Sequence, residues 1–291
     1  MKRVISMGLI LSGFLWLFGC TQGAGDSKMK EFHYNVQVCG YTDSVPGAEY
    51  SLEFPLWYSE SYEENKLKGE KFEWKKDDIS LTGTYKDSAV RKYEYDPTHR
   101  FEGKDGHDFE IDENGTLVYF YLGWERDDSA KQSFSQEQCV EIAKKFFLKM
   151  VENADSYRVT VMYNDTFKDY SVIFTKYVDS WKTADQAEIR VNPTTGKIFS
   201  YRATMIEQMD ANAKLNLDQA KLDAVVTEKL DQIFEKAKEK YDEVNYGEYS
   251  YVLTKVSESE YAVVCEVSVD CVEKEGEYNM VFSGSMSFVI T

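Results

Sequence analysis

Two amphipathic segments, each followed by strand-like sequence, constrain the fold most strongly. Ser135 is a good helix N-cap, and Gln138 follows it at the spacing of a capping box. Apolar residues then recur at helical spacing, which predicts a helix over residues 136–152. Asp218 opens a second segment of this kind. Its apolar stripe consists of Leu222, Val225, Val226, Leu230 and Ile233. The repeated order predicts a helix-then-sheet duplication.

The remaining sequence favours strands. Across residues 31–128, aromatic or branched residues alternate with polar ones, as they do in half-buried strands. The clearest hairpin covers residues 109–120, with its turn at Asn114 and Gly115. Residues 192–196 form another turn, in which proline presets φ and glycine permits a positive φ. These patterns predict an α+β fold, in which antiparallel sheet modules are each packed by one helix behind a β-rich N-terminal region.

The N-terminus carries the pattern of an exported lipoprotein. Two basic residues precede an apolar stretch of about 15 residues, which suits a signal peptide and is short for a membrane-spanning helix. The stretch ends in Leu17, Phe18, Gly19 and Cys20, which resembles a bacterial lipobox, although Phe18 is bulkier than usual there. The resemblance implies that Cys20 receives diacylglyceryl and palmitate-type chains and anchors the protein to the outer face of the cell membrane. An ordinary secretory signal or a buried N-terminal helix is the alternative.

The net charge argues against one class of partner. The formal charge is −17, and loss of residues 1–19 would make it more negative because that segment is basic. Such a surface repels phosphate backbones, so we expect no nucleic-acid binding. Cationic partners such as basic peptides remain compatible with this charge. So does the simpler role of keeping an extracellular protein soluble.

The middle of the chain resembles a PepSY domain. The helix of that family has a central alanine, matched here by Ala143, and its closing hairpin carries a Thr-Gly-Lys turn. The matching hairpin residues are Asn192, Thr195, Gly196, Lys197 and Ile198. Residues 109–120 resemble the same hairpin without its helix. The resemblance implies an extracytoplasmic binding or inhibitory module, of a kind proposed to restrain peptidases, and it implies no catalytic residue.

Each predicted domain boundary lies shortly before one of the helices that open near residues 135 and 217. The predicted segments are a lipoprotein signal peptide at 1–19, a flexible tether at 20–30, a β-rich N-terminal domain at 31–128, a PepSY-like α+β domain at 129–206 and a second α+β domain at 207–291. The polar, glycine-containing composition of the second segment is typical of a flexible linker.

Four cysteines follow Cys20, namely Cys39, Cys139, Cys265 and Cys271. Outside the cytoplasm they could form two disulfides with three alternative pairings. On one continuous strand, Cys265 and Cys271 would stay roughly 20 Å apart, beyond disulfide reach. Cys139 lies near the apolar stripe of its helix, so we expect it to be buried as a thiol. The pairing of the cysteines stays open.

No motif identifies an enzyme, metal or cofactor site. The sequence lacks HExxH, GxSxG and a glycine-rich phosphate loop, so we predict no catalytic residue and no cofactor. Residues 96–113 gather His99, His107 and several carboxylates, which could hold a divalent ion. Their order does not match a calcium loop. The prediction is therefore a solvated acidic loop rather than a metal site.

The predicted function is non-enzymatic. We expect a membrane-anchored extracytoplasmic lipoprotein that binds an envelope protein or peptide, with a peptidase-restraining module as its most specific form. An envelope sensing or signalling accessory protein is the alternative, and a hydrolase without a recognisable motif is least favoured. A hydrolase should show clustered acids in a pocket, whereas a binding module should show an exposed sheet edge or an aromatic patch.

Overall fold

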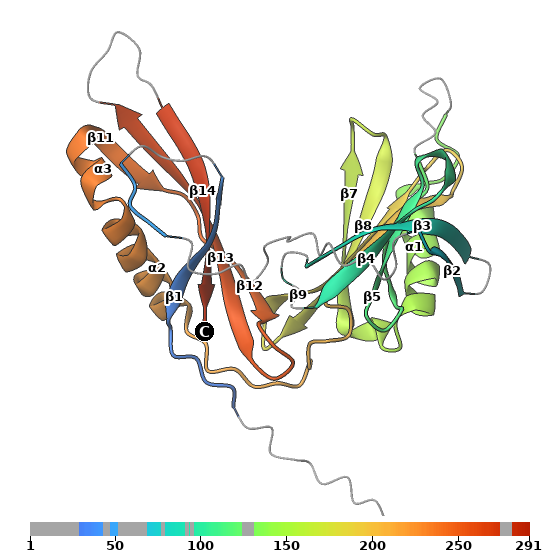
Figure 1. Ribbon diagram of the computed structural model, residues 1–291, viewed down its shortest axis with the longest axis horizontal. Helices are drawn as coiled ribbons and strands as arrows, with labels where there is room; N and C mark the ends of the chain where they lie inside the picture. Colours follow the sequence, from blue (N-terminus) through green and yellow to red (C-terminus); the bar gives the residue numbers. More distant parts are fainter. Residues whose placement is uncertain are drawn as a thin grey trace, which may run out of the picture.

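Strands dominate the computed structural model (Figure 1). It describes residues 29–42, 47–51, 69–76, 79–90, 93, 96–123, 131–273 and 281–291. Within these ranges the α-helices are α1 (Gln136–Met150), α2 (Gln219–Ile233) and α3 (Glu235–Lys240), with short 3-10 turns at Lys104–Gly106 and Ala154–Ser156. None of the described helices is both long and apolar enough to cross a membrane. The predicted signal peptide and Cys20 lie outside the described residues.

The predicted α+β class is wrong. Strands account for 51% of the described residues and helices for 19%. The described strands form one mixed sheet of 14 strands rather than separate modules that are each packed by one helix. The physical reason is a seam in the middle of the sheet, where Leu253 on one side pairs in parallel with Thr183 on the other. Periodicity along a strand specifies which face is buried, but it does not specify which distant strand will pair with it.

Helix α1 packs against the larger part of the sheet. The strands of this part are β2 (Lys71–Lys76), β3 (Ile79–Val90), β4 (Pro97–Glu102), β5 (Asp108–Asp112), β6 (Leu117–Tyr121), β7 (Tyr157–Asn164), β8 (Asp169–Val178), β9 (Trp181–Val191) and β10 (Ile198–Thr204). Neighbours in the order β2-β3-β4-β5-β6-β10-β9-β8-β7 pair antiparallel. Ala143, Phe146 and Phe147 of α1 are buried on this part of the sheet. The ring of Phe147 stacks on that of Phe174, with 4.1 Å between the centroids.

The second hydrophobic cluster lies under α2. Its strands are β1 (Val36–Thr42), β11 (Tyr241–Tyr246), β12 (Ser250–Lys255), β13 (Tyr261–Glu273) and β14 (Val281–Ile290). The predicted apolar stripe of α2 is buried here at Leu222, Val226, Leu230 and Ile233. Three hydrogen-bonded pairs connect α2 to β11, β12 and the segment between them: Tyr251 with Asp223, Tyr249 with Thr227, and Tyr246 with Asp231. Although β1 comes from the predicted N-terminal domain, it pairs with β14. The domain boundaries stay predictions.

The local sequence signals are confirmed. Ser135 accepts a hydrogen bond from the backbone N–H of Gln138, and the side chain of Gln138 accepts one from Ser135 N–H at 2.8 Å. Asp218 caps α2 through the backbone N–H groups of its first turn. Gly115 and Gly196 both adopt positive φ, at 79° and 69°. The helix at α1 ends at Met150, slightly before the predicted boundary.

Candidate functional site

An acidic cavity of about 280 Å³ opens where the end of α1 meets the β5–β6 hairpin and the segment after β10. Its carboxylates are those of Asp96, Asp112, Glu113 and Glu207, and none of its described lining residues is basic. Burial, followed by the charges of Glu113 and Asp112, raises the pKa of Asp96. The cavity therefore concentrates negative charge, which a bound cation would offset.

The lining of this acidic cleft also includes apolar side chains. They are Val118, Met150, Met205 and Ile206. Carboxylates beside apolar side chains suit a long cationic side chain, whose methylene stem packs while its charged head reaches the carboxylates. The volume lies just below the roughly 300–1,000 Å³ of typical small-molecule pockets. The dimensions thus fit one lysine or arginine side chain of a partner.

His99 of β4 contacts the cleft residue Glu113. Its Nε2 lies 3.3 Å from Glu113 Oε1, and its Nδ1 lies 2.7 Å from Ser88 Oγ. The Ser88 hydroxyl also forms a 2.7 Å hydrogen bond with the hydroxyl of Tyr85. Serine, histidine and carboxylate are the residue types of a hydrolase triad. Ser88 is only 5% exposed and is not among the described residues that line the cleft, so its hydroxyl is poorly placed to attack a bound substrate.

The cleft wall after β10 has a strained backbone. Met205 and Glu207 adopt φ values of 47° and 59°, in the left-handed region that side chains other than glycine rarely occupy. Each such residue costs of order 1 kcal/mol or more and persists only where its surroundings hold it in place. The contacts that hold this segment therefore determine the shape of the cleft.

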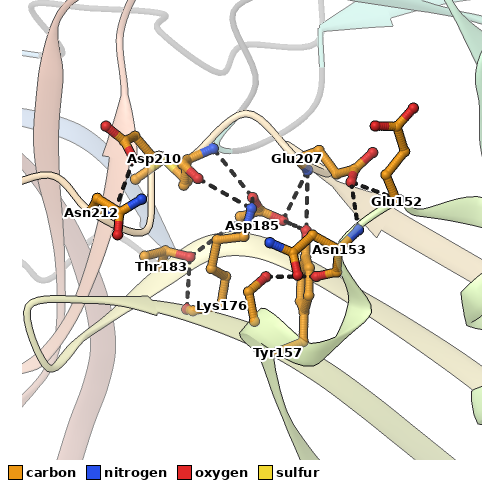
Figure 2. A network of polar contacts seen from close by, with 11 residues as sticks. Glu152, Asn153, Tyr157, Lys176, Thr183, Asp185, Glu207, Asp210 and Asn212 are labelled. Atoms are coloured by element: carbon orange, nitrogen blue, oxygen red, sulfur yellow. Dashed lines mark hydrogen bonds and ion pairs between the residues drawn. The ribbon is translucent and has the colours of Figure 1, made fainter. Parts of the chain in front are cut away.

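A buried network centred on Asp185 of β9 holds the segment (Figure 2). Asp185 Oδ1 accepts hydrogen bonds from Tyr157 OH at 2.6 Å and from the backbone N–H of Glu207 at 3.2 Å. Its Oδ2 accepts one from Met209 N–H at 3.2 Å and lies 2.9 Å from Lys176 Nζ. Lys176 also donates to the backbone carbonyl of Met209 at 3.1 Å. One ion pair thus fixes both ends of the segment 207–209.

Burial makes this network sensitive to the loss of any member. Asp185 is 0% exposed and Lys176 is 6% exposed. Burial raises the pKa of Asp185 even though Tyr157 and Lys176 favour its charged form. Glu207 extends the network by accepting hydrogen bonds from the backbone N–H groups of Glu152 and Asn153, at 2.8 and 3.3 Å. The cleft wall is thereby attached to the end of α1 as well as to β9.

The structure changes the interpretation of the acidic loop. Of its predicted candidates, Asp96 lines the cleft and His99 contacts the lining residue Glu113, whereas His107 lies beside Gly123. No group of three or more His, Cys, Asp or Glu side chains within the described ranges is arranged to hold a metal ion. Sequence reasoning missed the wall after β10 and its anchor. A charged residue at an inward position of an apolar strand, as at Lys176 and Asp185, was the one signal for them.

Three of the cysteines are buried thiols. Cys139 is fully buried on α1, as predicted, and both Cys265 and Cys271 lie on the continuous strand β13. Burial raises the pKa of Cys139 to about 11 and is the main cause that raises that of Cys265 to about 12. The reactive form of a cysteine is the thiolate. Burial and the raised pKa therefore disfavour the reactive thiolate form of these two side chains at neutral pH.

The chain belongs to the family of the YcdB, YcdC repeated domain, which matches residues 51–205. The match includes β2 to β10 and α1, and it is consistent with the predicted PepSY-like domain. No protein of curated function matches the sequence. The C-terminal domain of Bacillus megaterium YpeB is similar in structure, with a TM-score of 0.31 and 13% identity over 73% of this chain and 87% of that chain.

Proposed function

We propose that this protein is a membrane-anchored extracytoplasmic lipoprotein that binds a protein or peptide partner without catalysing a reaction. The acidic cleft receives a lysine or arginine side chain of that partner. The observation that carries the proposal is the combination of carboxylates at Asp96, Asp112, Glu113 and Glu207 with apolar side chains in one small cavity. The overall charge of −17 adds long-range attraction for a basic partner.

The more specific form of the proposal is a peptidase-restraining module. The PepSY resemblance of residues 129–206 supports it, because that family is proposed to restrain peptidases, and the family match includes most of this segment. A basic side chain in the cleft would fix the orientation of the partner. Charge pairs at the rim of a protein–protein interface contribute mainly to the association rate and to specificity.

The binding test compares two capped peptides that differ only in a central lysine or norleucine, titrated by calorimetry. The lysine peptide should bind more tightly, and the double variant Asp96→Asn/Glu113→Gln should weaken its binding about tenfold, which corresponds to about 1.4 kcal/mol. For the parent protein, a higher salt concentration should weaken binding of the lysine peptide, because the charge pairs in the cleft are partly exposed. A lower pH should also weaken it, because Asp96 takes up a proton.

A matched control separates the cleft from the overall charge. Glu228→Gln/Glu235→Gln removes the same number of charges from α2 and α3 and should leave peptide binding unchanged. Equal binding of the lysine and norleucine peptides would contradict the proposal. So would equal losses in the two double variants, because that result would assign the effect to net charge alone.

The membrane anchor has a separate test. Cys20 lies outside the described residues, so the lipidation proposal is based on the sequence alone. Cys20→Ser should move the protein from the membrane fraction to the soluble fraction, and labelled fatty acid should no longer be incorporated. Unchanged membrane association of Cys20→Ser would contradict this part of the proposal without affecting the cleft.

A hydrolase is the second candidate, favoured by the Ser88–His99–Glu113 chain beside clustered carboxylates. The burial of Ser88 argues against it. Peptide and glycan substrates should remain intact with the full-length protein. If they are cleaved, and if Ser88→Ala and His99→Asn abolish cleavage while the melting temperature is kept, the non-enzymatic proposal is wrong.

A further inference from the structure

Within the described part of the chain, strand β7 is an open edge of the sheet. Among the described residues it pairs only with β8, in an unbroken register from Tyr157 opposite Lys176 to Asn164 opposite Asp169. The two strands form a hairpin that projects from the sheet in Figure 1. Because a strand paired on one side leaves alternate backbone N–H and C=O groups free on the other, β7 offers a row of hydrogen-bonding groups to an additional strand.

This edge lacks the features that usually protect one. Natural edge strands are short, or carry lysine, proline or a bulge. β7 has eight residues, continuous register and no proline or lysine. Its only charged residue is Arg158, and that guanidinium group lies over the ring of Tyr177 at 4.0 Å. The charge therefore lies against the protein's own sheet, where it does not oppose pairing with a further strand.

Exposed apolar side chains are concentrated on the same hairpin. Of the large hydrophobic residues that the structure describes as exposed, Val159, Met162, Tyr163 and Phe167 belong to it. Val159 and Tyr163 lie two strand repeats apart and therefore share one face of β7. A partner strand with branched or aromatic residues on that face would form the cross-strand pairs that stabilise sheets.

We propose that β7 is a docking edge for an extended, non-acidic segment of a partner protein, which adds to the sheet as a further strand. Charge complementarity favours a segment that is neutral or basic, because the chain carries a net charge of −17. The same charge opposes pairing with a second copy.

This inference deepens the proposed function, and rests on it, by stating the form in which the partner is bound. Main-chain hydrogen bonds to β7 would supply affinity, and alternate side chains facing Val159 and Tyr163 would supply selectivity. Backbone pairing depends little on salt, whereas binding of a basic side chain in the acidic cleft weakens as salt rises. The two contacts can therefore be measured separately.

The probe is a capped, uncharged and fluorescently labelled peptide of alternating valine and threonine, with the length of β7. Its control is the same peptide with N-methyl groups on alternate backbone nitrogens, which removes the donors needed for strand addition. The unmodified peptide should bind at least about tenfold more tightly than the control at both low and high salt. Equal binding of the two peptides would overturn the proposal.

Two proline variants locate the docking edge. Of two neighbouring residues in β7, one directs its N–H toward β8 and the other directs it toward solvent. One of Thr160→Pro and Val161→Pro should therefore lower the melting temperature by breaking the β7–β8 pairing. The other should keep the melting temperature and lose at least about tenfold in affinity for the peptide. If the variant that keeps its melting temperature also keeps its affinity for the peptide, the proposal is overturned.

This design tests the cleft proposal and the edge proposal independently. The variant Asp96→Asn/Glu113→Gln should bind the uncharged peptide as the parent protein does. If lysine peptides bind the cleft while the uncharged peptide does not bind, only the edge proposal is wrong. Sedimentation of the parent protein tests the other occupant, because a dimer that is lost in the stable proline variant would assign the edge to a second copy and overturn the proposal.

Discussion

Replacing Lys176 by methionine tests the network that shapes the cleft wall. The substitution keeps the length of the side chain but removes the cation that lies 2.9 Å from Asp185 Oδ2. Breaking a buried pair by removing one partner costs about 3–5 kcal/mol. Asp185 keeps three donors, from Tyr157 and the backbone N–H groups of Glu207 and Met209. The loss at neutral pH should therefore be near the lower limit, at about 3 kcal/mol.

The pH dependence of this loss has a definite sign. Burial already raises the pKa of Asp185 above its ordinary value of 3.8, and removal of Lys176 raises it further. Between pH 3.8 and the raised pKa of the variant, Asp185 binds a proton in the folded chain but not in the unfolded chain. The stability of the variant therefore increases as the pH falls through the raised pKa. The difference between Lys176→Met and the parent protein should therefore shrink from pH 7 toward pH 4.

Urea unfolding followed by tryptophan fluorescence at both pH values provides the measurement. The double variant Lys176→Met/Asp185→Asn leaves no charge at this buried site, so it should be more stable than the single variant at pH 7 and should lack the extra pH dependence of the single variant. The argument is refuted if the single variant loses less than about 1 kcal/mol at pH 7. It is also refuted if the loss is the same at both pH values, or if the double variant is no more stable than the single one.

Three further predictions concern other sites. Asp96→Asn should stabilise the protein at neutral pH by at most about 1 kcal/mol, because the raised pKa of Asp96 reflects an unfavourable charge, and thermal melts should show this gain vanish below the ordinary carboxyl pKa. Gly196→Ala should cost about 1–3 kcal/mol, since a Cβ there would lie 2.7 Å from an aromatic ring. Gly106→Ala, with positive φ but open space, should cost less, and equal losses in urea unfolding would contradict this. Cys139 and Cys265 should react with a thiol reagent only on unfolding, so rapid labelling of the native protein would contradict their burial.

Sequence predicted the features that depend on near neighbours in the chain. The capping box joins Ser135 to Gln138, and the turn at residues 192–196 depends on its own proline and glycine, so both follow from local chemistry. The seam between β9 and β12 joins strands that are far apart in sequence, and no periodicity encodes such a pairing. This long-range pairing is why the predicted fold class was wrong.

The candidate site shows the same division. Its acidic side was visible in the sequence as a loop rich in carboxylates, but the loop alone predicted only a solvated surface. The cleft exists because the end of α1 and residues 205–208 form the other wall. Those residues are brought there by a buried pair between β8 and β9, where Lys176 and Asp185 meet only after the strands have paired.

The seam between β9 and β12 also affects how this protein can change over evolutionary time. One hydrophobic cluster surrounds α1 and the other lies under α2, and the parallel register across the seam consists of the pair Leu253 and Thr183. Effects of substitutions at distant sites that share no partners usually add. Each core can therefore accumulate substitutions at its own rate, while the strands at the seam must continue to match each other.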